Sequence, residues 1–354
     1  MSLLDKIKNN STIKNSAILS ISKFFTQKDM IPTSIPMINV ALSGKLNGGF
    51  TPGITMFAGP SKHFKTAFSL LMAKSYLEKY PESVIIFYDS EFGTPQSYFN
   101  TFDIDTNRVL HTPLTNIEEL KFDIMKQLEG IERNERVMII IDSIGNLASK
   151  KEVEDALDGK SVADMSRAKQ VKSLFRMVTP HLNLKDIPMV VVNHTYKEIG
   201  MFPKDIVGGG TGSYYSADNI FIIGRQQEKE GTEIVGYNFI INVEKSRNVR
   251  EKSKIPVCVL FEGGISKWSG LLENALESGH VIKPTNGWYS KVDKNTGEIG
   301  TKKRLSDTMS EEFWSDILLK EDFNEFVRKK YEIAYGNIMG DIMGENDVLE
   351  SEKA

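Results

Sequence analysis

Cysteine is almost absent from this sequence, whose 354 residues include only Cys258. A single thiol cannot form a disulfide within the chain, which excludes a disulfide-stapled secreted scaffold and favours a reducing compartment. No apolar run approaches the roughly 20 residues of a membrane-spanning helix. Residues 1–16 lack the apolar core and small-residue cleavage site of a secretion signal. We therefore expect a cytoplasmic protein without a membrane partner, in which Cys258 is a small core residue.

Strong charge of one sign is also missing, because the formal net charge is −3. This excludes a large, uniformly basic surface, so any binding of nucleic acid would depend on local patches. With 40% hydrophobic and 26% charged residues, the composition is typical of a globular protein. The length suits one large domain or two modest ones.

Apolar runs of strand length occur repeatedly between residues 53 and 224, and each is continuous rather than alternating. Strands that are buried on both faces have this pattern, as in a parallel sheet covered by helices. The runs are GITMFAG (53–59), SVIIFYD (83–89), RVMIIID (136–142), PMVVVN (188–193) and NIFIIG (219–224).

Helical segments separate several of these runs, which predicts right-handed βαβ units and an α/β fold with a mostly parallel central sheet. The segments are residues 65–80, 115–130 and 166–180. We expect the second helix to begin with a capping box of Thr115 and Glu118 and to end at Gly130. We expect the third helix to end at Pro180.

The pattern changes towards the C-terminus. The runs at 237–245 and 255–263 have no helix between them and are expected to pair antiparallel at the sheet edge. Turn-rich and helical stretches follow, and the last residues are mostly acidic. We therefore divide the chain into an N-terminal arm (1–30), an α/β core (31–270), a small C-terminal α+β domain (271–340) and an acidic tail (341–354).

The segment GPSKHFKT nearly matches the phosphate-binding pattern G-x-x-x-x-G-K-[ST] and lies between a predicted strand and a predicted helix. Backbone N–H groups and the helix N-terminus would bind phosphates there, Lys65 would reach the β- and γ-phosphates of ATP, and Thr66 would bind Mg²⁺. The candidate ATP-binding residues are Gly59, Pro60, Ser61, Lys62, His63, Phe64, Lys65 and Thr66.

Phe64 stands where the pattern has its second glycine. The backbone angles that glycine allows there cost a residue with a Cβ about 1 kcal/mol or more. The loop can still close if Phe64 adopts a standard conformation with its ring directed away from the phosphates. The alternative is a strand–turn–helix corner with a chance match to the pattern.

Acidic residues follow two of the predicted strands. Asp142 ends one strand, where a metal-linked water needs a partner, and Glu91 follows another strand, where it could orient an attacking water. Each acid alone is equally consistent with a structural or solvated position. Together with Lys65, they supply the cation, metal partner and base that nucleotide hydrolysis requires.

Several further segments carry a family resemblance that covers nearly the whole chain. They are IPMINVALSGKLNGGF (35–50), AGPSKHFKT (58–66), FYDSEFG (87–93), IDSIGNLASKKE (141–152), VNHTY (192–196), GGGTGSYYSAD (208–218), VEKSR (243–247) and GLLENALESGHVIKPTNGWYS (270–290). The chain resembles the RecA-type recombinases, most closely the UvsX recombinases of tailed phages. The GPSKxFK form is typical of the phage branch, so Phe64 is interpreted as a feature of that branch. The resemblance implies a RecA-like P-loop ATPase core, with residues 1–30 as an oligomerisation arm.

The resemblance also implies residue roles. It assigns catalysis to Lys65, Glu91, Asp142 and His194, and Mg²⁺ binding to Thr66 and Asp142. Tyr98 falls where the family stacks an aromatic ring on adenine, although Pro95 stands where RecA has an acid. His194 stands at the position where RecA has a glutamine that links the γ-phosphate to the DNA loop. Without the resemblance, a lone histidine at a strand end is usually structural. Lys245 and Arg247 match basic residues that reach the neighbouring subunit's ATP, and would otherwise belong to a solvated strand end.

Two loops are candidates for single-stranded DNA, because they carry cations for phosphates and, in the second loop, an aromatic residue for bases. The first, 147–167, offers Lys150, Lys151, Lys160 and Arg167. The second, 195–212, offers Lys197, Phe202, Lys204, Gly208, Gly209 and Gly210. Without the resemblance, both would be interpreted as mobile surface connections.

The function implied by the resemblance is that of a DNA-dependent ATPase, with ATP and Mg²⁺ as cofactors. It would form helical filaments on single-stranded DNA and promote homologous pairing and strand exchange in recombination, repair and replication. Implied partners are homologous duplex DNA, further copies of the chain, a recombination mediator and a single-strand-binding protein in the bacterial host cytoplasm. One alternative is a non-hydrolysing filament or adaptor protein. Another is a ring-forming helicase, and the N-terminal arm and the NGWYS segment argue against the helicase.

Overall fold

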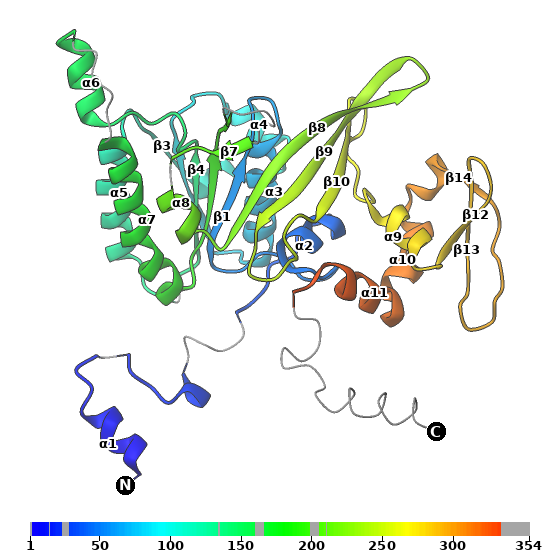
Figure 1. Ribbon diagram of the computed structural model, residues 1–354, viewed down its shortest axis with the longest axis horizontal. Helices are drawn as coiled ribbons and strands as arrows, with labels where there is room; N and C mark the ends of the chain where they lie inside the picture. Colours follow the sequence, from blue (N-terminus) through cyan, green and yellow to red (C-terminus); the bar gives the residue numbers. More distant parts are fainter. Residues whose placement is uncertain are drawn as a thin grey trace, which may run out of the picture.

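The computed structural model describes residues 2–13, 15–22, 28–133, 135–159, 166–198, 205–209 and 211–333. Within these residues, a central sheet carries helices on both faces (Figure 1). Its strands are β1 (Gly53–Ala58), β2 (Val84–Asp89), β3 (Val109–Pro113), β4 (Val137–Asp142), β5 (Pro188–Asn193), β8 (Asn219–Glu230), β9 (Glu233–Lys245), β10 (Lys254–Leu260) and β11 (Gly264–Ile265). Their order is β11-β10-β9-β8-β1-β5-β4-β2-β3.

The strands from β8 to β3 pair in parallel, and β9, β10 and β11 add an antiparallel edge. The predicted fold class and the edge pair are therefore confirmed. The strand β3 was not predicted, and β8 continues six residues beyond the predicted end at residue 224. Together β8 and β9 form a long ribbon that projects from the sheet (Figure 1).

The two faces of the sheet are buried under different helices. The helices of this core are α2 (Pro36–Ser43), α3 (Lys65–Lys79), α4 (Gln96–Asn100), α5 (Ile117–Gly130), α6 (Lys150–Leu157), α7 (Ser166–Lys185) and α8 (Thr211–Ser216), with the 3-10 turn η2 (Thr106–Arg108). Phe57 on β1 packs against Phe68 of α3. Its neighbour Met56 points to the other face, into the cluster with Ile124 of α5 and Leu174 of α7. The apolar runs of β1, β4 and β5 are continuous because both faces of these three strands are buried.

A smaller unit follows the core and lies beside its antiparallel edge (Figure 1). It comprises α9 (Leu271–Glu277), β12 (Val281–Thr285), β13 (Trp288–Lys291), β14 (Lys303–Arg304), η3 (Ser306–Thr308), α10 (Glu311–Leu319) and α11 (Glu321–Tyr331). The three strands form an antiparallel sheet in the order β12-β13-β14. The buried side chains of Trp314 and Phe323 belong to the same apolar cluster as the helix α2, so this small α+β domain packs directly on the core.

The N-terminal arm contains α1 (Leu3–Asn9) and η1 (Leu19–Ile21). The helix α1 has a capping box of Ser2 and Asp5 but no buried residue, and Leu3 and Ile7 are 75% and 59% exposed. In the part of the chain described, no helix combines the length and apolar character of a membrane span.

Two predicted helix boundaries are wrong. The second helix begins at Ile117, because Asn116 rather than Thr115 caps it by accepting from the Glu119 N–H at 3.0 Å; this start places Ile117 in the core. The third helix, α7, continues past Pro180 to Lys185. Its last turn is stabilised by the fully buried Leu182, so tertiary packing outweighs the missing N–H of the proline.

Candidate nucleotide and DNA site

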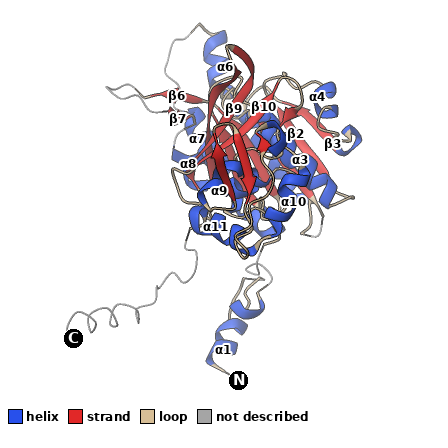
Figure 2. Cartoon of the chain, turned by 90° about the vertical axis from the view of Figure 1, so that its right-hand side faces the viewer, coloured by secondary structure: helices blue, strands red, loops and turns tan. Residues whose placement is uncertain are grey.

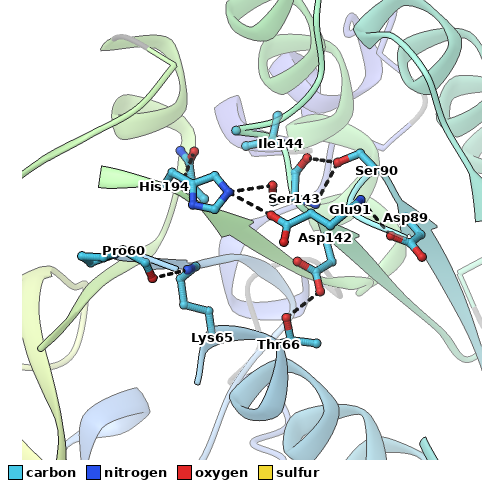
Figure 3. Close-up of polar contacts among 12 residues, drawn as sticks. Pro60, Lys65, Thr66, Asp89, Ser90, Glu91, Asp142, Ser143, Ile144 and His194 are labelled. Carbon is cyan, nitrogen blue, oxygen red and sulfur yellow. Dashed lines mark hydrogen bonds and ion pairs between the residues drawn. The ribbon is translucent and has the colours of Figure 1, made fainter. Parts of the chain in front are cut away.

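The phosphate loop connects β1 directly to α3, as the sequence predicts. Lys65 is the first residue of α3, where unpaired helix N–H groups favour an anion. Its side chain is buried, and Nζ donates to the carbonyl oxygen of Pro60 at 2.8 Å (Figure 3). Burial lowers the pKa of Lys65, while Glu91 and Asp142 act in the opposite direction. The structure thus presents a partly desolvated cation that interacts electrostatically with two carboxylates.

Phe64 does not adopt the standard conformation that we gave as a condition for closing the loop. Its φ of 62° and ψ of 16° are those of a left-handed residue, so the backbone keeps the shape that glycine normally provides. The ring is directed into the protein, where it stacks on Phe239 at 4.8 Å and meets Phe68 edge-on at 5.5 Å. A left-handed residue costs about 1–2 kcal/mol, and each aromatic pair returns roughly 0.5–1.5 kcal/mol. These contacts are therefore large enough to offset the backbone strain.

Thr66 and Asp142 meet as the predicted metal-binding pair. The Thr66 hydroxyl donates to Asp142 Oδ2 at 2.6 Å (Figure 3). Asp142 Oδ1 is buried without a hydrogen-bond partner among the described residues, and burial raises the pKa of this carboxyl to about 6. A buried carboxylate oxygen without a partner is a place for a cation, and carboxylate and hydroxyl oxygens suit Mg²⁺. The residues present therefore fit a magnesium ion.

Glu91 and His194 contact each other across the site. Nε2 of His194 lies 2.9 Å from Glu91 Oε1 and 3.4 Å from the Ser143 hydroxyl (Figure 3). The hydrogen bond with His194 is the largest factor that lowers the pKa of Glu91, so the carboxylate is ionised at neutral pH. Buried Asp89 fixes the turn before Glu91, because its Oδ1 accepts the N–H groups of Glu91 and Phe92 at 3.0 and 2.8 Å. Asp89 was not among the predicted site residues.

The backbone of His194 leads to the second loop. Its carbonyl oxygen accepts from the Gly208 N–H at 2.9 Å, and the buried Asn193 amide donates to the Gly208 carbonyl at 2.8 Å. Gly145 gives the imidazole its space, since a Cβ there would lie 2.6 Å from His194 Cδ2. Asn193 and Gly145 were not predicted from the sequence. Of the two, only Asn193 could have been recognised, because it stands at the end of a predicted strand.

The first loop contains a short helix, α6, which was not predicted although SKKE provides a capping box of Ser149 and Glu152. Lys150 and Lys151 lie in its first turn and are exposed. Arg167 has a different position from these lysines. Its guanidinium donates to the carbonyl oxygens of residues 144, 145 and 147 at 2.7–3.1 Å, so it holds the segment that leaves β4.

The base of the second loop is a small hairpin of β6 (Thr195–Lys197) and β7 (Asp205–Val207). Lys197 pairs with Asp205 at 2.8 Å and its side chain is 66% exposed. Gly208 and Gly209 follow β7, and Gly209 has a φ of 88° that favours glycine. Both α6 and the hairpin lie away from α9 and α11 (Figure 1 and Figure 2). The remaining predicted DNA residues lie outside the described residues: Lys160, Phe202, Lys204 and Gly210.

Lys245 and Arg247 lie at the opposite edge of the sheet from the phosphate loop. Lys245 pairs in register with Ile220 at the start of β8, whereas the loop follows the end of β1, which runs parallel to β8. Lys245 Nζ donates to the carbonyl oxygens of Tyr214 and Ala217, both at 2.8 Å. Neither cation therefore lies at the sheet edge where the phosphate loop begins.

Tyr98 lies on α4, beyond the turn that carries Glu91. Its half-buried ring meets Phe102 edge-on at 5.5 Å and packs against the apolar core. Burial raises the pKa of this phenol, and the Asp142 carboxylate contributes in the same direction. The ring therefore lies close enough to the Asp142 carboxylate for the two groups to interact electrostatically.

Fold and site together define a mononucleotide-binding α/β core with a P-loop between the strand β1 and the helix α3. Residues 4–266 match the RecA N-terminal domain, and residues 268–327 match the C-terminal domain of the bacteriophage T4 recombination and repair protein. The chain therefore belongs to the RecA family.

Individual relatives agree with this assignment. The chain is 48% identical to the "Recombination and repair protein" of Enterobacteria phage T4, over 97% of this chain and 87% of the relative. It is 26% identical to "Protein RecA" of Bacteroides thetaiotaomicron, over 77% and 80%, and 26% identical to that of Streptomyces rimosus, over 76% and 70%. The similarity to the phage protein includes the small C-terminal domain, whereas the bacterial matches cover about three quarters of the chain.

Proposed function

We propose that this protein is a DNA-dependent ATPase that assembles on single-stranded DNA and promotes homologous pairing and strand exchange. One observation carries the proposal. His194 contacts the candidate catalytic carboxylate through its ring and the base of the second loop through its backbone. The strands β2, β4, β5 and β1 are neighbours, so their carboxyl ends bring the acid, the metal pair, His194 and the phosphate loop to one sheet edge.

The nucleotide would bind along the phosphate loop, with Lys65 on the β- and γ-phosphates and Tyr98 against the adenine. In this proposal Thr66 and Asp142 hold Mg²⁺, which would neutralise charge that develops on the phosphate oxygens. Lys65 would leave its internal contact with the Pro60 carbonyl to reach the phosphates. The same buried lysine explains why an anionic ligand is favoured, because desolvation strengthens charge pairing.

Glu91 would orient the attacking water, since its depressed pKa keeps it able to accept a hydrogen bond. Its carboxylate is also held by His194. When the γ-phosphate or DNA changes the position of His194, the contact with Glu91 changes with it. This arrangement would couple hydrolysis to the state of the second loop.

DNA would lie against both loops, with Lys150, Lys151 and Lys197 as candidate phosphate contacts. Among the remaining candidates, Arg167 would act by holding the first loop in place, and the glycines at 208 and 209 would give the second loop its turn. The four candidates outside the described residues remain proposals based on sequence.

A helical filament would place each nucleotide between two subunits. Lys245 and Arg247 lie at the sheet edge away from their own phosphate loop, which supports contact with the ATP of a neighbour. The exposed apolar face of α1, with Leu3 and Ile7, would pack on the adjacent subunit. A recombination mediator and a single-strand-binding protein are proposed as further partners, in the cytoplasm of a bacterial host.

Strand exchange tests the proposal directly. The purified chain is mixed with ATP, Mg²⁺, a labelled single strand and a homologous duplex, and joint molecules are separated by electrophoresis. We expect joint molecules with the homologous duplex and none with a heterologous duplex of equal length. DNA binding without exchange of the homologous duplex would contradict the proposal and favour an adaptor protein.

A further inference from the structure

The phosphate loop contains two residues with a side chain in the left-handed region, Lys62 and Phe64, with φ of 61° and 62°. Both contact one cross-strand pair, because Arg225 on β8 pairs in register with Phe239 on β9. The Phe64 ring stacks on Phe239 at 4.8 Å with 17° between the planes. The guanidinium of Arg225 donates to the Lys62 carbonyl at 3.3 Å. Each unusual backbone position thus has its own contact with the β8–β9 ribbon.

The surface that receives the loop is itself fixed. Phe239 is only 4% exposed and belongs to the main apolar cluster. Tyr237 lies two residues earlier on the same strand, with its ring 6.1 Å from that of Phe239. Arg225 lies over the Tyr237 ring at 4.8 Å, so this ring helps to orient the cation that contacts the loop. A rigid support of this kind can hold a loop in one shape.

We propose that Phe239, assisted by Arg225, is a positioning residue that holds the phosphate loop in its nucleotide-binding shape through Phe64. In the usual motif, a glycine adopts the left-handed angles without strain. Here a residue with a Cβ is held at those angles by a stacked ring. The inference rests on the proposed function of the loop in binding ATP. It adds that the ribbon, and not only the loop, determines nucleotide affinity.

The proposal predicts that leucine and glycine at Phe64 affect nucleotide binding in the opposite order from that expected of a residue that only fills space. If Phe64 only filled space, leucine would be a milder replacement than glycine, because it retains more apolar volume. If the stack holds a strained backbone, leucine is worse, since it keeps the Cβ and loses the ring contact. The loop then relaxes, and the nucleotide binds only the fraction of molecules with the competent shape.

The experiment measures the dissociation constant of a fluorescent ATP analogue with Mg²⁺ for the full chain and its variants. We expect Phe64→Leu to bind about tenfold more weakly than Phe64→Gly, given the strain of a left-handed residue with a Cβ. Phe64 is only half-buried, so both variants should fold, which thermal melting checks. Equal affinities, or tighter binding by the leucine variant, would overturn the proposal.

A double-mutant cycle tests the partner on the ribbon. We expect Phe239→Leu to weaken nucleotide binding several-fold in the wild-type background, and Phe239→Tyr, which keeps the ring, to weaken it less. In the Phe64→Gly background, Phe239→Leu should have less than a twofold effect. The matched control is Phe261→Leu, because the Phe261 ring contacts Tyr237 but is 64% exposed; its affinity should equal that of the wild type.

The outcomes separate the two proposals. If Phe239→Leu weakens binding equally in both backgrounds, the stack serves packing alone, and the positioning role is wrong while ATP binding stands. If the wild-type chain does not bind the analogue, the proposed function of the loop fails, and the positioning role fails with it. If Phe239→Leu unfolds the chain, the comparison of leucine and glycine at Phe64 still decides the matter.

Discussion

Nε2 of His194 lies 2.9 Å from Oε1 of Glu91, and this contact joins the two strand ends that the proposed mechanism needs to connect. The histidine follows β5 and the glutamate follows β2, with β4 between them in the sheet. Because the backbone of His194 also accepts from Gly208, one residue contacts both the candidate catalytic acid Glu91 and the second loop. The first predictions follow from this link.

Replacement of His194 by alanine should reduce DNA-stimulated ATP hydrolysis by about fivefold or more, and basal hydrolysis less. The reason is that Glu91 keeps its place through Asp89 but loses its connection to the loop. The measurement is steady-state hydrolysis with and without single-stranded DNA. His194→Gln, which keeps a side-chain donor, should retain part of the stimulation. An equal loss of both rates in His194→Ala would show a plain catalytic or structural role.

Gly145→Ala should also weaken the coupling between DNA binding and ATP hydrolysis, although it removes no polar group. The new Cβ would lie 2.6 Å from His194 Cδ2, so the imidazole must shift away from Glu91. We expect reduced DNA stimulation, measured in the same assay. Gly130→Ala is the matched control, since a Cβ at that position meets nothing within 4 Å. Full stimulation in the Gly145 variant would contradict the assigned geometry.

Lys65→Ala should abolish ATP turnover, with a loss of about a hundredfold or more, because it removes the buried cation at the helix N-terminus. Lys74→Ala is the control on the same helix, where the side chain pairs with exposed Asp103 at 2.9 Å. That variant should hydrolyse ATP at the wild-type rate. Normal turnover in Lys65→Ala would remove the basis for the nucleotide site.

The single thiol provides a test of pH dependence. Cys258 is only partly buried, so it is not the core residue that we expected. This partial burial raises the pKa of its thiol to about 11, whereas an unfolded thiol ionises near 8.5. At pH 8 the native chain should therefore react with an alkylating reagent roughly a hundredfold more slowly than the urea-unfolded chain. Since the unfolded thiol loses its proton first, this group should lower the free energy of unfolding as pH rises from about 8.5 towards 11. Equal alkylation rates would contradict the burial.

Much of the core could be predicted from local patterns of apolar residues in the sequence. The continuous run VMIIID predicted a strand buried on both faces, and each of its residues is buried. The loop before Lys65 was predicted because a phosphate-binding segment must follow a strand and open a helix. Both features depend on residues that are close together in the sequence, which is why sequence alone could identify them.

The remaining features depend on distant contacts. Pro180 was predicted to end α7, but burial of Leu182 extends the helix. A standard conformation of Phe64 was the condition given for closing the loop, yet Phe64 lies in the left-handed region and its ring stacks on Phe239, far along the chain. The space that Gly145 leaves for His194 could not be inferred either, since it exists only where two loops meet. Such relationships are created by the fold and leave no periodic signal.

The most direct measurement is ATP hydrolysis by the wild-type chain, with and without single-stranded DNA at fixed Mg²⁺. We predict turnover that DNA stimulates strongly, because His194 connects the second loop to Glu91 beside the phosphate loop. Turnover at one unchanged rate in the presence and absence of bound DNA would contradict that connection, and absence of turnover would contradict the catalytic site itself.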